Sequence, residues 1–290
     1  MIAWCINLMV SALVAVVSVV PTLAAWTATT QDAAPETLTR RLSWSGTQTS
    51  RALQVSNLHG DIRIVAEDRV DVAVTATRVI ERQVAGDPAP QPDFRQESAG
   101  LLVCGDSSHC GCHLERTDER QYERRERTRV RVDLELRVPR LVTLDVCGVN
   151  GGQVRIDGTD GPFTVRNVNG AIRMVGVRGA GSVTTVNGSV QASFTAPPAS
   201  PTTFRTVNGT VDVTMPPSLA ADLHLTTRNG GLYTDFDTTT LPTQTATRER
   251  KGGRVLYRAD RFTSVRVGRG GPELTFETLN GDVRVRKANP

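Results

Sequence analysis

The chain has 290 residues, a formal net charge of +4 and only 4% aromatic residues. With so few aromatic side chains, Val, Ile, Leu and Ala must fill the core, which suits thin, stacked β layers. The basic charge is almost all arginine and is interspersed with carboxylates. The sequence has no array of aromatic residues on which bases could stack, so we expect no nucleic-acid partner.

We interpret residues 1–24 as an export signal. Residues 8–20 are apolar, and the small residues Thr22 and Ala24 fit a cleavage site that ends at Ala24. Residues 1–7 contain no Lys or Arg, so the alternative is an uncleaved N-terminal anchor, which would then be the only contact with a membrane. Both interpretations place the rest of the chain outside the cytoplasm, in the periplasm or at the cell surface.

Residues 25–50 are predicted to form a linker, because they are rich in Thr, Ala, Ser and Gln and have no sustained period. Residues 51–138 contain short runs in which apolar and polar residues alternate, as in half-buried strands. These N-terminal β coils are interrupted by a Cys/His cluster at residues 104–113. A mixed-charge stretch follows at residues 115–127 and is interpreted as solvated surface.

From residue 139 to 290 the sequence repeats a phrase in which Asn-Gly is followed by an alternating strand. The first five full copies are 19, 18, 21 and 21 residues apart, and a degenerate copy, His59-Gly60, occurs upstream. Self-similarity at about twenty residues is typical of stacked repeats. The predicted turn residues are Asn150, Gly151, Asn169, Gly170, Asn187, Gly188, Asn208, Gly209, Asn229, Gly230, Asn280 and Gly281.

Alignment of the copies on Asn-Gly separates inward from outward positions. The third and fifth residues after Asn are mostly apolar, as Ile172 and Met174 are, and are predicted to form the core. We expect each Gly to provide a turn with positive φ, and the Asn side chains to form a hydrogen-bonded ladder. The outward position between the two core residues reads Arg63, Arg155, Arg173, Gln191, Asp212, Tyr233 and Arg284.

The fold class is predicted to be all-β, a β-solenoid with coils of about 20 residues and Asn-Gly corners. Because Asn-Gly between alternating runs is also the strongest hairpin signal, an antiparallel meander or a sandwich is the alternative. The coil length and the constant side-chain type in each column favour the solenoid. The final coil, residues 255–286, is expected to close the stack.

Residues 139–194 contain the phrases PRLVTLDVCGVNGGQVRI, FTVRNVNGAIRMVGV and VTTVNGSVQASF. These resemble the bacterial "putative adhesin" β-strand-repeat family, a domain of unknown function that is related to the head domain of autotransporter adhesins. The likeness covers about residues 50–290. It implies an exported or envelope-associated, right-handed β-solenoid without an established activity, and it provides no catalytic or binding residues.

Four cysteines and two histidines are candidate site residues: Cys104, His109, Cys110, Cys112, His113 and Cys147. Three thiolates and an imidazole could hold zinc or copper(I), although C-x5-C-x-C-H is not a standard zinc spacing. In an oxidising compartment disulfides are favoured, such as Cys104 to Cys110 or Cys112, with Cys147 taking the remaining cysteine. We therefore expect no metal or other cofactor.

A carbohydrate-active β-helix enzyme would need carboxylates clustered on one exposed face. Asp235 and Asp237 alternate on a predicted strand and could pair, and Asp61 and Asp282 occupy matching places at opposite ends of the repeat. None of these sets forms a catalytic cluster, and His224 is interpreted as a structural histidine. No catalytic residue is assigned, and the chain is predicted not to be an enzyme.

The sequence thus predicts a non-enzymatic, secreted or envelope-associated scaffold. Its polar, arginine-bearing face would contact a cell-envelope polymer, a glycan or a protein. One alternative is a carbohydrate-active β-helix enzyme. The other is a metal- or redox-sensing envelope protein that acts through residues 104–113.

Overall fold

The computed structural model describes residues 34–44, 51–98, 100–107, 110, 128–150, 152–242, 247–251, 254–258 and 262–289, with residues 247–251, 254–258 and 262 described by backbone alone. The chain divides into two units, Met1–Asp32 and Ala33–Pro290, and all described residues belong to the second. The expected export signal, the stretch 115–127, and His109, Cys112, His113 and Gly151 lie outside the described residues. No helix in the described part is long and apolar enough to span a membrane.

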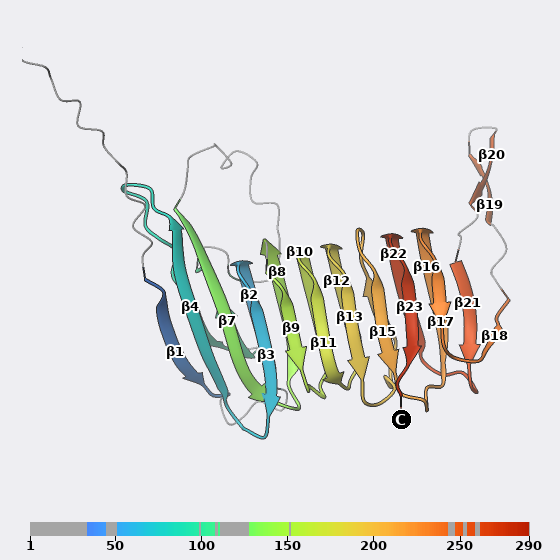
Figure 1. Ribbon diagram of the computed structural model, residues 1–290, viewed down its shortest axis with the longest axis horizontal. Coiled ribbons are helices and arrows are strands. Elements are labelled where there is room, and N and C mark those ends of the chain that lie inside the picture. The colour runs from blue at the N-terminus through green and yellow to red at the C-terminus, as the bar shows by residue number, and fades with distance from the viewer. Residues whose placement is uncertain are drawn as a thin grey trace, which may run out of the picture. The chain divides into compact units, whose positions relative to one another are not determined.

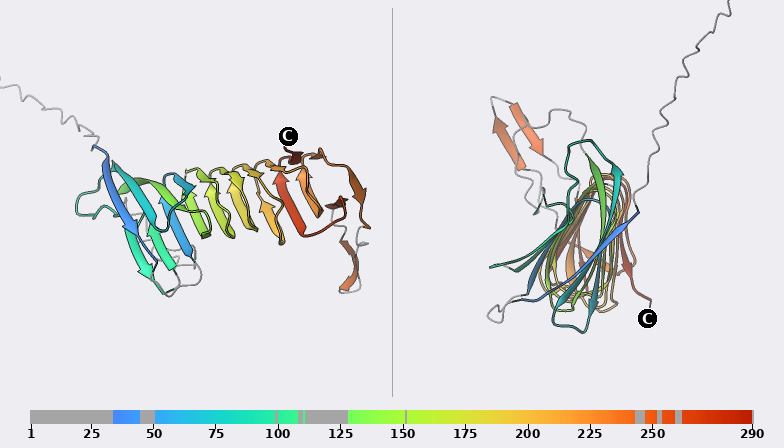
Figure 2. Two further views of the ribbon diagram at one scale, coloured as in Figure 1. Left: turned by 90° about the horizontal axis from the view of Figure 1, so that it is seen from below. Right: turned by 90° about the vertical axis from the view of Figure 1, so that its left-hand side faces the viewer.

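The described residues are all-β and form two large mixed sheets that face each other (Figures 1 and 2). The ten-stranded sheet has the order β1 (Glu36–Leu42), β4 (Val72–Arg82), β7 (Arg129–Pro139), β3 (Ile62–Glu67), β9 (Val154–Asp157), β11 (Ile172–Val177), β13 (Val190–Phe194), β15 (Val211–Met215), β23 (Val283–Lys287) and β17 (Leu232–Thr234). The eleven-stranded sheet has the order β18 (Thr238–Thr240), β21 (Phe262–Val267), β16 (Ala221–Asn229), β22 (Glu273–Asn280), β14 (Thr202–Arg205), β12 (Gly181–Asn187), β10 (Phe163–Asn169), β8 (Thr143–Asn150), β2 (Ala52–His59), β6 (Gly100–Cys104) and β5 (Asp93–Glu97). A separate hairpin pairs β19 (Thr247–Lys251) with β20 (Arg254–Arg258).

From β8 to β15, successive strands alternate between the two sheets. The strands β8, β10, β12 and β14 are parallel neighbours in the eleven-stranded sheet, and β9, β11, β13 and β15 are parallel neighbours in the ten-stranded sheet. Each pair of strands is displaced by about 4.8 Å from the pair before it. Corresponding residues of the repeat therefore lie side by side, as Asn150, Asn169 and Asn187 do.

Both ends of the sheets add antiparallel strands to this parallel centre. At the N-terminal end β1 pairs with β4 along all its seven residues, although it lies within residues 25–50, where the sequence predicted a linker. Only Leu38 and Leu42 of β1 pack against the core. Two apolar contacts in an otherwise polar strand are too few to give a recognisable period, which explains the difference.

The C-terminal strands β22 and β23 lie between two earlier pairs of strands. β22 pairs with β14 on one side and β16 on the other, and β23 pairs in the same way with β15 and β17. Figure 1 places the C-terminus there, beside β23. The expectation that the final coil closes the stack is wrong, because the Asn-Gly phrase is nearly the same in each copy and does not specify which copies are neighbours.

One hydrophobic cluster fills the space between the sheets and extends from Leu53 to Val285, across both segments 51–138 and 139–290. The predicted core columns are confirmed. Their members Ile62, Ile64, Ile172, Met174, Val190, Ala192, Val211, Val213, Val283 and Val285 are each at most 5% exposed. The core is not purely aliphatic, however, because neighbouring phenylalanines form a row. Ring centroids are 6.4 Å apart for Phe163 and Phe194, 5.9 Å for Phe194 and Phe204, and 5.2 Å for Phe204 and Phe276.

Candidate functional site

The corner asparagines form a continuous ladder of side-chain hydrogen bonds. Each side-chain amide donates to the side-chain oxygen of the asparagine in a neighbouring strand pair. The bonds run from Asn169 to Asn150 (3.3 Å), Asn187 to Asn169 (2.8 Å), Asn208 to Asn187 (2.8 Å), Asn280 to Asn208 (2.7 Å) and Asn229 to Asn280 (2.6 Å). The ladder includes the inserted copy at Asn280, so it holds the strand pairs at one register.

A second ladder, whose donors are buried except for the half-buried Thr227, was not expected from the sequence. Two residues before the corner Asn, a Thr or Asn side chain donates to a glycine carbonyl of the adjoining strand pair. The bonds run from Asn167 to Gly152 (2.9 Å), Thr185 to Gly170 (2.9 Å), Thr206 to Gly188 (2.7 Å), Thr278 to Gly209 (2.9 Å) and Thr227 to Gly281 (2.8 Å). The signal is present in the sequence as Asn/Thr-x-Asn-Gly.

The corner glycines are required by close packing more than by backbone conformation. At Gly188, a Cβ atom would lie 2.2 Å from the carbonyl oxygen of Gly170. Gly281 has a φ of 147°, but Gly188 and Gly230 are not among the glycines with positive φ, and no described non-glycine residue has one. The expectation that each turn needs positive φ is therefore wrong. The glycines instead let one corner approach the backbone of the next.

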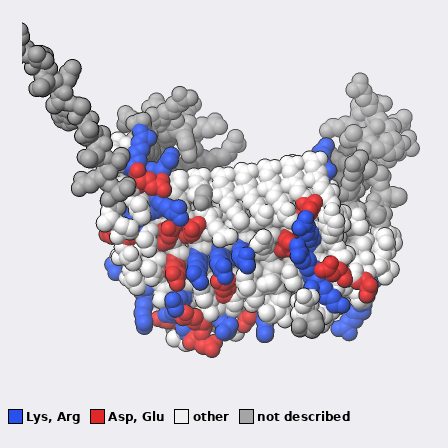
Figure 3. Space-filling model, viewed as in Figure 1, with Lys and Arg blue, Asp and Glu red and all other residues white. Residues whose placement is uncertain are grey.

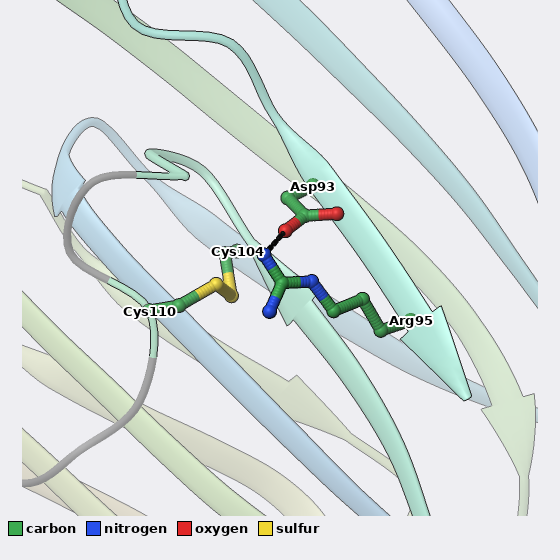
Figure 4. The surroundings of a disulfide bond; sticks show 4 residues. All are labelled: Asp93, Arg95, Cys104 and Cys110. Atoms are coloured by element: carbon green, nitrogen blue, oxygen red, sulfur yellow. Dashed lines mark ion pairs between the residues drawn. A yellow bond between two sulfur atoms is a disulfide. The ribbon is translucent and has the colours of Figure 1, made fainter. Parts of the chain in front are cut away.

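A disulfide lies where the Cys/His segment leaves the eleven-stranded sheet. Cys104 is bonded to Cys110, with their Cα atoms 5.4 Å apart (Figure 4). Cys147 is also disulfide-bonded, to a partner outside the described residues. Cys104 and Cys147 are both in register with Ser56, on the strands that flank β2. Because Val55, the residue before Ser56, faces the core, Ser56 and the two cysteines beside it are placed on the outer face of this sheet.

The disulfides remove cysteines that the sequence offered as metal ligands. A sulfur in a disulfide is not a thiolate ligand, so Cys104, Cys110 and Cys147 are not available to zinc or copper. Among the described residues, no group of three or more His, Cys, Asp or Glu side chains could hold a metal ion. Disulfides persist in oxidising compartments, and they indicate that the folded chain is extracytoplasmic.

The region around the disulfide is held by strand pairing and by charge. Asp93 of β5 is opposite Cys104 of β6 in the antiparallel register. Its carboxylate forms an ion pair with Arg95 of the same strand, as Figure 4 shows. These contacts fix the end of β6 from which the Cys/His segment departs.

Asp61 and Asp282, the two candidate catalytic carboxylates at matching places in the repeat, each form a hydrogen bond to a neighbouring strand pair. Asp61 accepts a hydrogen bond from the backbone N–H of Gln153 (2.7 Å), and Asp282 accepts one from Gly231 (3.0 Å). Their strands β3 and β23 are five positions apart in the sheet, or about 24 Å. The paired carboxyl groups of glycosidases are about 5–9.5 Å apart, so these two residues cannot form such a pair.

The pKa of Asp282 is shifted in the direction opposite to that of a general acid. The hydrogen bond from the Gly231 backbone N–H makes the largest contribution to lowering this pKa. The interaction with Arg284 lowers the pKa further. A general acid at neutral pH needs a raised carboxyl pKa. The environment of Asp282 instead stabilises the ionised form, as expected for a structural carboxylate.

Asp235 and Asp237 also lack the arrangement expected from the sequence. They flank the buried Phe236 in the bend between β17 and β18, so the prediction that they alternate on a strand is wrong. The Asp235 carboxylate accepts a hydrogen bond from the backbone N–H of Lys287 (3.2 Å). The Phe side chain explains the difference, because its burial ends β17 where the alternation would have continued.

His224 contacts a hydroxyl and a carboxylate in the eleven-stranded sheet. Its Nδ1 lies 2.9 Å from the Oγ of Ser264, and its Nε2 lies 3.8 Å from a carboxylate oxygen of Glu273. Ser264 is only 4% exposed, so its hydroxyl is not accessible to a substrate. These contacts fit the structural role that the sequence indicated for His224.

The outward column of the ten-stranded sheet forms a row of side chains in register. From β7 to β17 the row consists of Glu135, Arg63, Arg155, Arg173, Gln191, Asp212, Arg284 and Tyr233. Figure 3 shows this face, where basic side chains lie among acidic ones over the N-terminal half and form a second group nearer the C-terminal end. The hydrogen bond that Arg155 donates to the Asp157 carboxylate raises the pKa of Arg155. Guanidinium groups are cations in proteins, so each arginine of this row contributes one positive charge.

Comparisons with known proteins give a likeness of fold only. No protein-family model and no curated protein matches the chain. A solved structure of a "putative cell adhesion protein" from Clostridium sporogenes is similar at 8% identity and a TM-score of 0.46, over 88% of this chain and 100% of that chain. A "putative adhesin" from Bacteroides fragilis is similar at 10% identity and a TM-score of 0.27, over 87% of this chain and 97% of that chain. At such low identity the likeness assigns no function to this chain.

Proposed function

We propose that this protein is a non-enzymatic, extracytoplasmic β-solenoid scaffold that acts by surface contact, in an adhesin-like role. The observation that carries the proposal is the outward row from Glu135 to Tyr233, which crosses eight neighbouring strands in register. The two corner ladders keep the spacing of this row constant. A rigid polar face loses little conformational entropy on binding, which suits contact with an extended polymer or surface.

The solenoid part of the proposal is supported by the alternation of strands between the sheets. In a right-handed solenoid of about 20-residue coils, each coil contacts only its neighbours, so one whole coil is removable. Deletion of residues 170–187, which joins Asn169 to Gly188, is expected to leave a folded protein. Deletion of half a coil, residues 170–178, moves each later strand to the wrong sheet and should abolish folding. Equal tolerance of both deletions, measured by circular dichroism and thermal unfolding, would count against the solenoid.

Export with cleavage after Ala24 is a further part of the proposal, and the disulfides at Cys104 and Cys147 support it. N-terminal sequencing of the protein recovered from its producing cells is expected to begin at Ala25. A retained Met1 would instead support the uncleaved anchor.

Surface contact is tested with the exported protein purified after cleavage. We expect saturable binding to intact cells or to an isolated envelope polymer, glycan or membrane preparation, without turnover of the bound material. Absence of binding to all of these would overturn the adhesin-like role. Release of new reducing ends from a glycan would overturn the non-enzymatic assignment.

A further inference from the structure

Three arginines lie side by side on the outer face of the ten-stranded sheet. Arg63 of β3, Arg155 of β9 and Arg173 of β11 are in register, and we name them the arginine row. Arg63 and Arg173 are exposed, and the side chain of Arg155 is 39% exposed. Because neighbouring strands are about 4.8 Å apart, the arginine row spans about 10 Å.

The arginine row differs from the other arginines of the central parallel strands in how its charge is balanced. On β23, Arg284 binds Asp282 and Arg286 binds Asp212, each at 2.7 Å. These two arginines are therefore neutralised by carboxylates of the same face. They show the usual arrangement on this sheet.

Within the arginine row, one of the three guanidinium groups has a carboxylate partner. Arg155 binds Asp157 at 2.8 Å. Arg173 donates to the neutral amide oxygen of Gln191 at 3.3 Å. Arg63 has no hydrogen-bond or ion-pair partner among the described residues. The row therefore retains a net positive charge.

The folded backbone holds these like charges together, which is unfavourable for cross-strand neighbours. Glu135 lies beside Arg63 in register, but its carboxylate pairs with Arg137 at 3.5 Å. An anion that bridges adjacent guanidinium groups would relieve the repulsion. The planar guanidinium fork matches the paired oxygens of carboxylate and sulfate groups.

We infer that the arginine row binds an acidic polysaccharide whose carboxylate or sulfate groups recur along the sugar chain. The inference rests on the proposed function, because it names the class of molecule that the outer face contacts. A linear polyanion fits because the three cations follow one another in a straight line across β3, β9 and β11. The Gln191 amide, next in register, is placed to hydrogen-bond a sugar hydroxyl, and the row of positive charge ends there, because Asp212 beyond it is paired with Arg286.

A single-stranded nucleic acid is also a linear polyanion, but its binding sites include aromatic side chains on which bases stack. The aromatic member of the outward column is Tyr233, four strands from Arg173, and its ring lies 5.7 Å from the Arg284 guanidinium. The arginine row itself combines charge with a neutral amide. This combination favours an acidic glycan over a nucleic acid.

The test compares binding of the full exported protein to oligogalacturonate, dextran sulfate, neutral dextran and single-stranded DNA. The first two ligands distinguish carboxylate from sulfate as the recognised group. The test variant is Arg63→Gln/Arg173→Gln. The matched control is Arg166→Gln/Arg205→Gln, which removes the same charge from the eleven-stranded sheet, where these arginines pair with Asp145 and Glu277.

We expect the wild type to bind one of the acidic glycans, to ignore dextran and to bind less tightly as salt is added. The Arg63→Gln/Arg173→Gln variant should bind at least about tenfold more weakly. Each exposed charge pair contributes up to about fivefold to the affinity, and the variant removes two such pairs. The control should change by less than about twofold. The charge-preserving Arg63→Lys/Arg173→Lys variant should be intermediate, because it keeps the cations without the planar fork.

An equal loss in the test variant and the control would overturn the site, as would equal binding to dextran. Tighter binding to DNA would overturn the choice of a glycan. Adhesion of the same proteins to intact cells separates this inference from the proposed function. If the test variant adheres to cells as well as the wild type, the inference about the arginine row fails, but the proposed role in surface contact is kept. If the wild type does not adhere, the proposed function itself fails.

Discussion

The corner of each repeat contains two polar side chains with different surroundings. The outer asparagines are exposed to water, so each of their hydrogen bonds contributes modestly to stability. The inner Thr185 is fully buried, and its hydroxyl satisfies the carbonyl oxygen of Gly170. A buried carbonyl that loses its donor is costly, because water cannot replace the missing hydrogen bond.

Thr185→Val tests this inner ladder with little change of shape. We expect the free energy of unfolding to fall by about 1–3 kcal/mol, because the half-buried Gly170 carbonyl loses the hydroxyl that donates to it. Thr184→Val, on the outward side of the same strand, should change it by less than about 0.5 kcal/mol. Urea unfolding measures both values, and equal losses would show that the buried hydrogen bond is not the cause.

Asp282 links the stability of its corner to pH. Its pKa is lowered in the folded chain by the Gly231 backbone and by Arg284. The stabilisation is therefore present above the unfolded-state pKa of about 3.9 and is lost as the pH falls through the lower folded pKa. Asp282→Asn should lower stability at neutral pH and flatten its decline below about pH 4. Parallel curves for wild type and variant in acid urea titrations would contradict this expectation.

At the scale of strands, the inserted pair β22–β23 connects two groups of strands that do not otherwise touch in the centre of the sheets. β22 is the neighbour of both β14 and β16. Phe276 of β22 is fully buried and stacks on Phe204, with an interplanar angle of 11°. Packing at this one strand therefore determines whether β16 is attached to the rest of the core.

Phe276→Ala is expected to lower the free energy of unfolding by about 3–5 kcal/mol, the usual cost of a cavity from a buried Phe. Leu279→Ala in the same strand should cost much less, since Leu279 is 41% exposed. Hydrogen exchange should show the largest loss of protection in β14, β16 and β22. If the two variants were equally destabilised, Phe276 would not be the residue that joins these strands.

The sequence predicted those features that one repeat determines by itself. Ile172 and Met174 were placed in the core because alternation with period 2 is visible within a single copy. The position of Phe276 between two earlier strand pairs could not be predicted, because it depends on a choice among near-identical neighbours. Thr185 was missed because Thr is common in strands on both faces, so its type alone does not indicate a buried hydrogen bond.

At the scale of the whole molecule, the described cysteines are paired by disulfides. Cys104 and Cys110 are bonded to each other, which leaves Cys112 as the partner expected for Cys147 once the signal with Cys5 is removed. Non-reducing peptide mapping should find Cys112 joined to Cys147. Cys112→Ser should then expose one titratable thiol per chain. A bond from Cys147 to Cys5 would show instead that the N-terminal segment is retained.

The place of β22 and β23 in the sheets also sets the order in which the fold can be completed. β16 and β17 precede them in the chain but reach β14 and β15 only through them. In a chain that crosses a membrane from its N-terminus, β16 lacks its neighbour β22 and β17 lacks its neighbour β23 until residues 273–287 have followed. Arrival of β22 and β23 on the far side of the membrane would then complete both sheets, so that the sheets mature only after these two strands have been translocated.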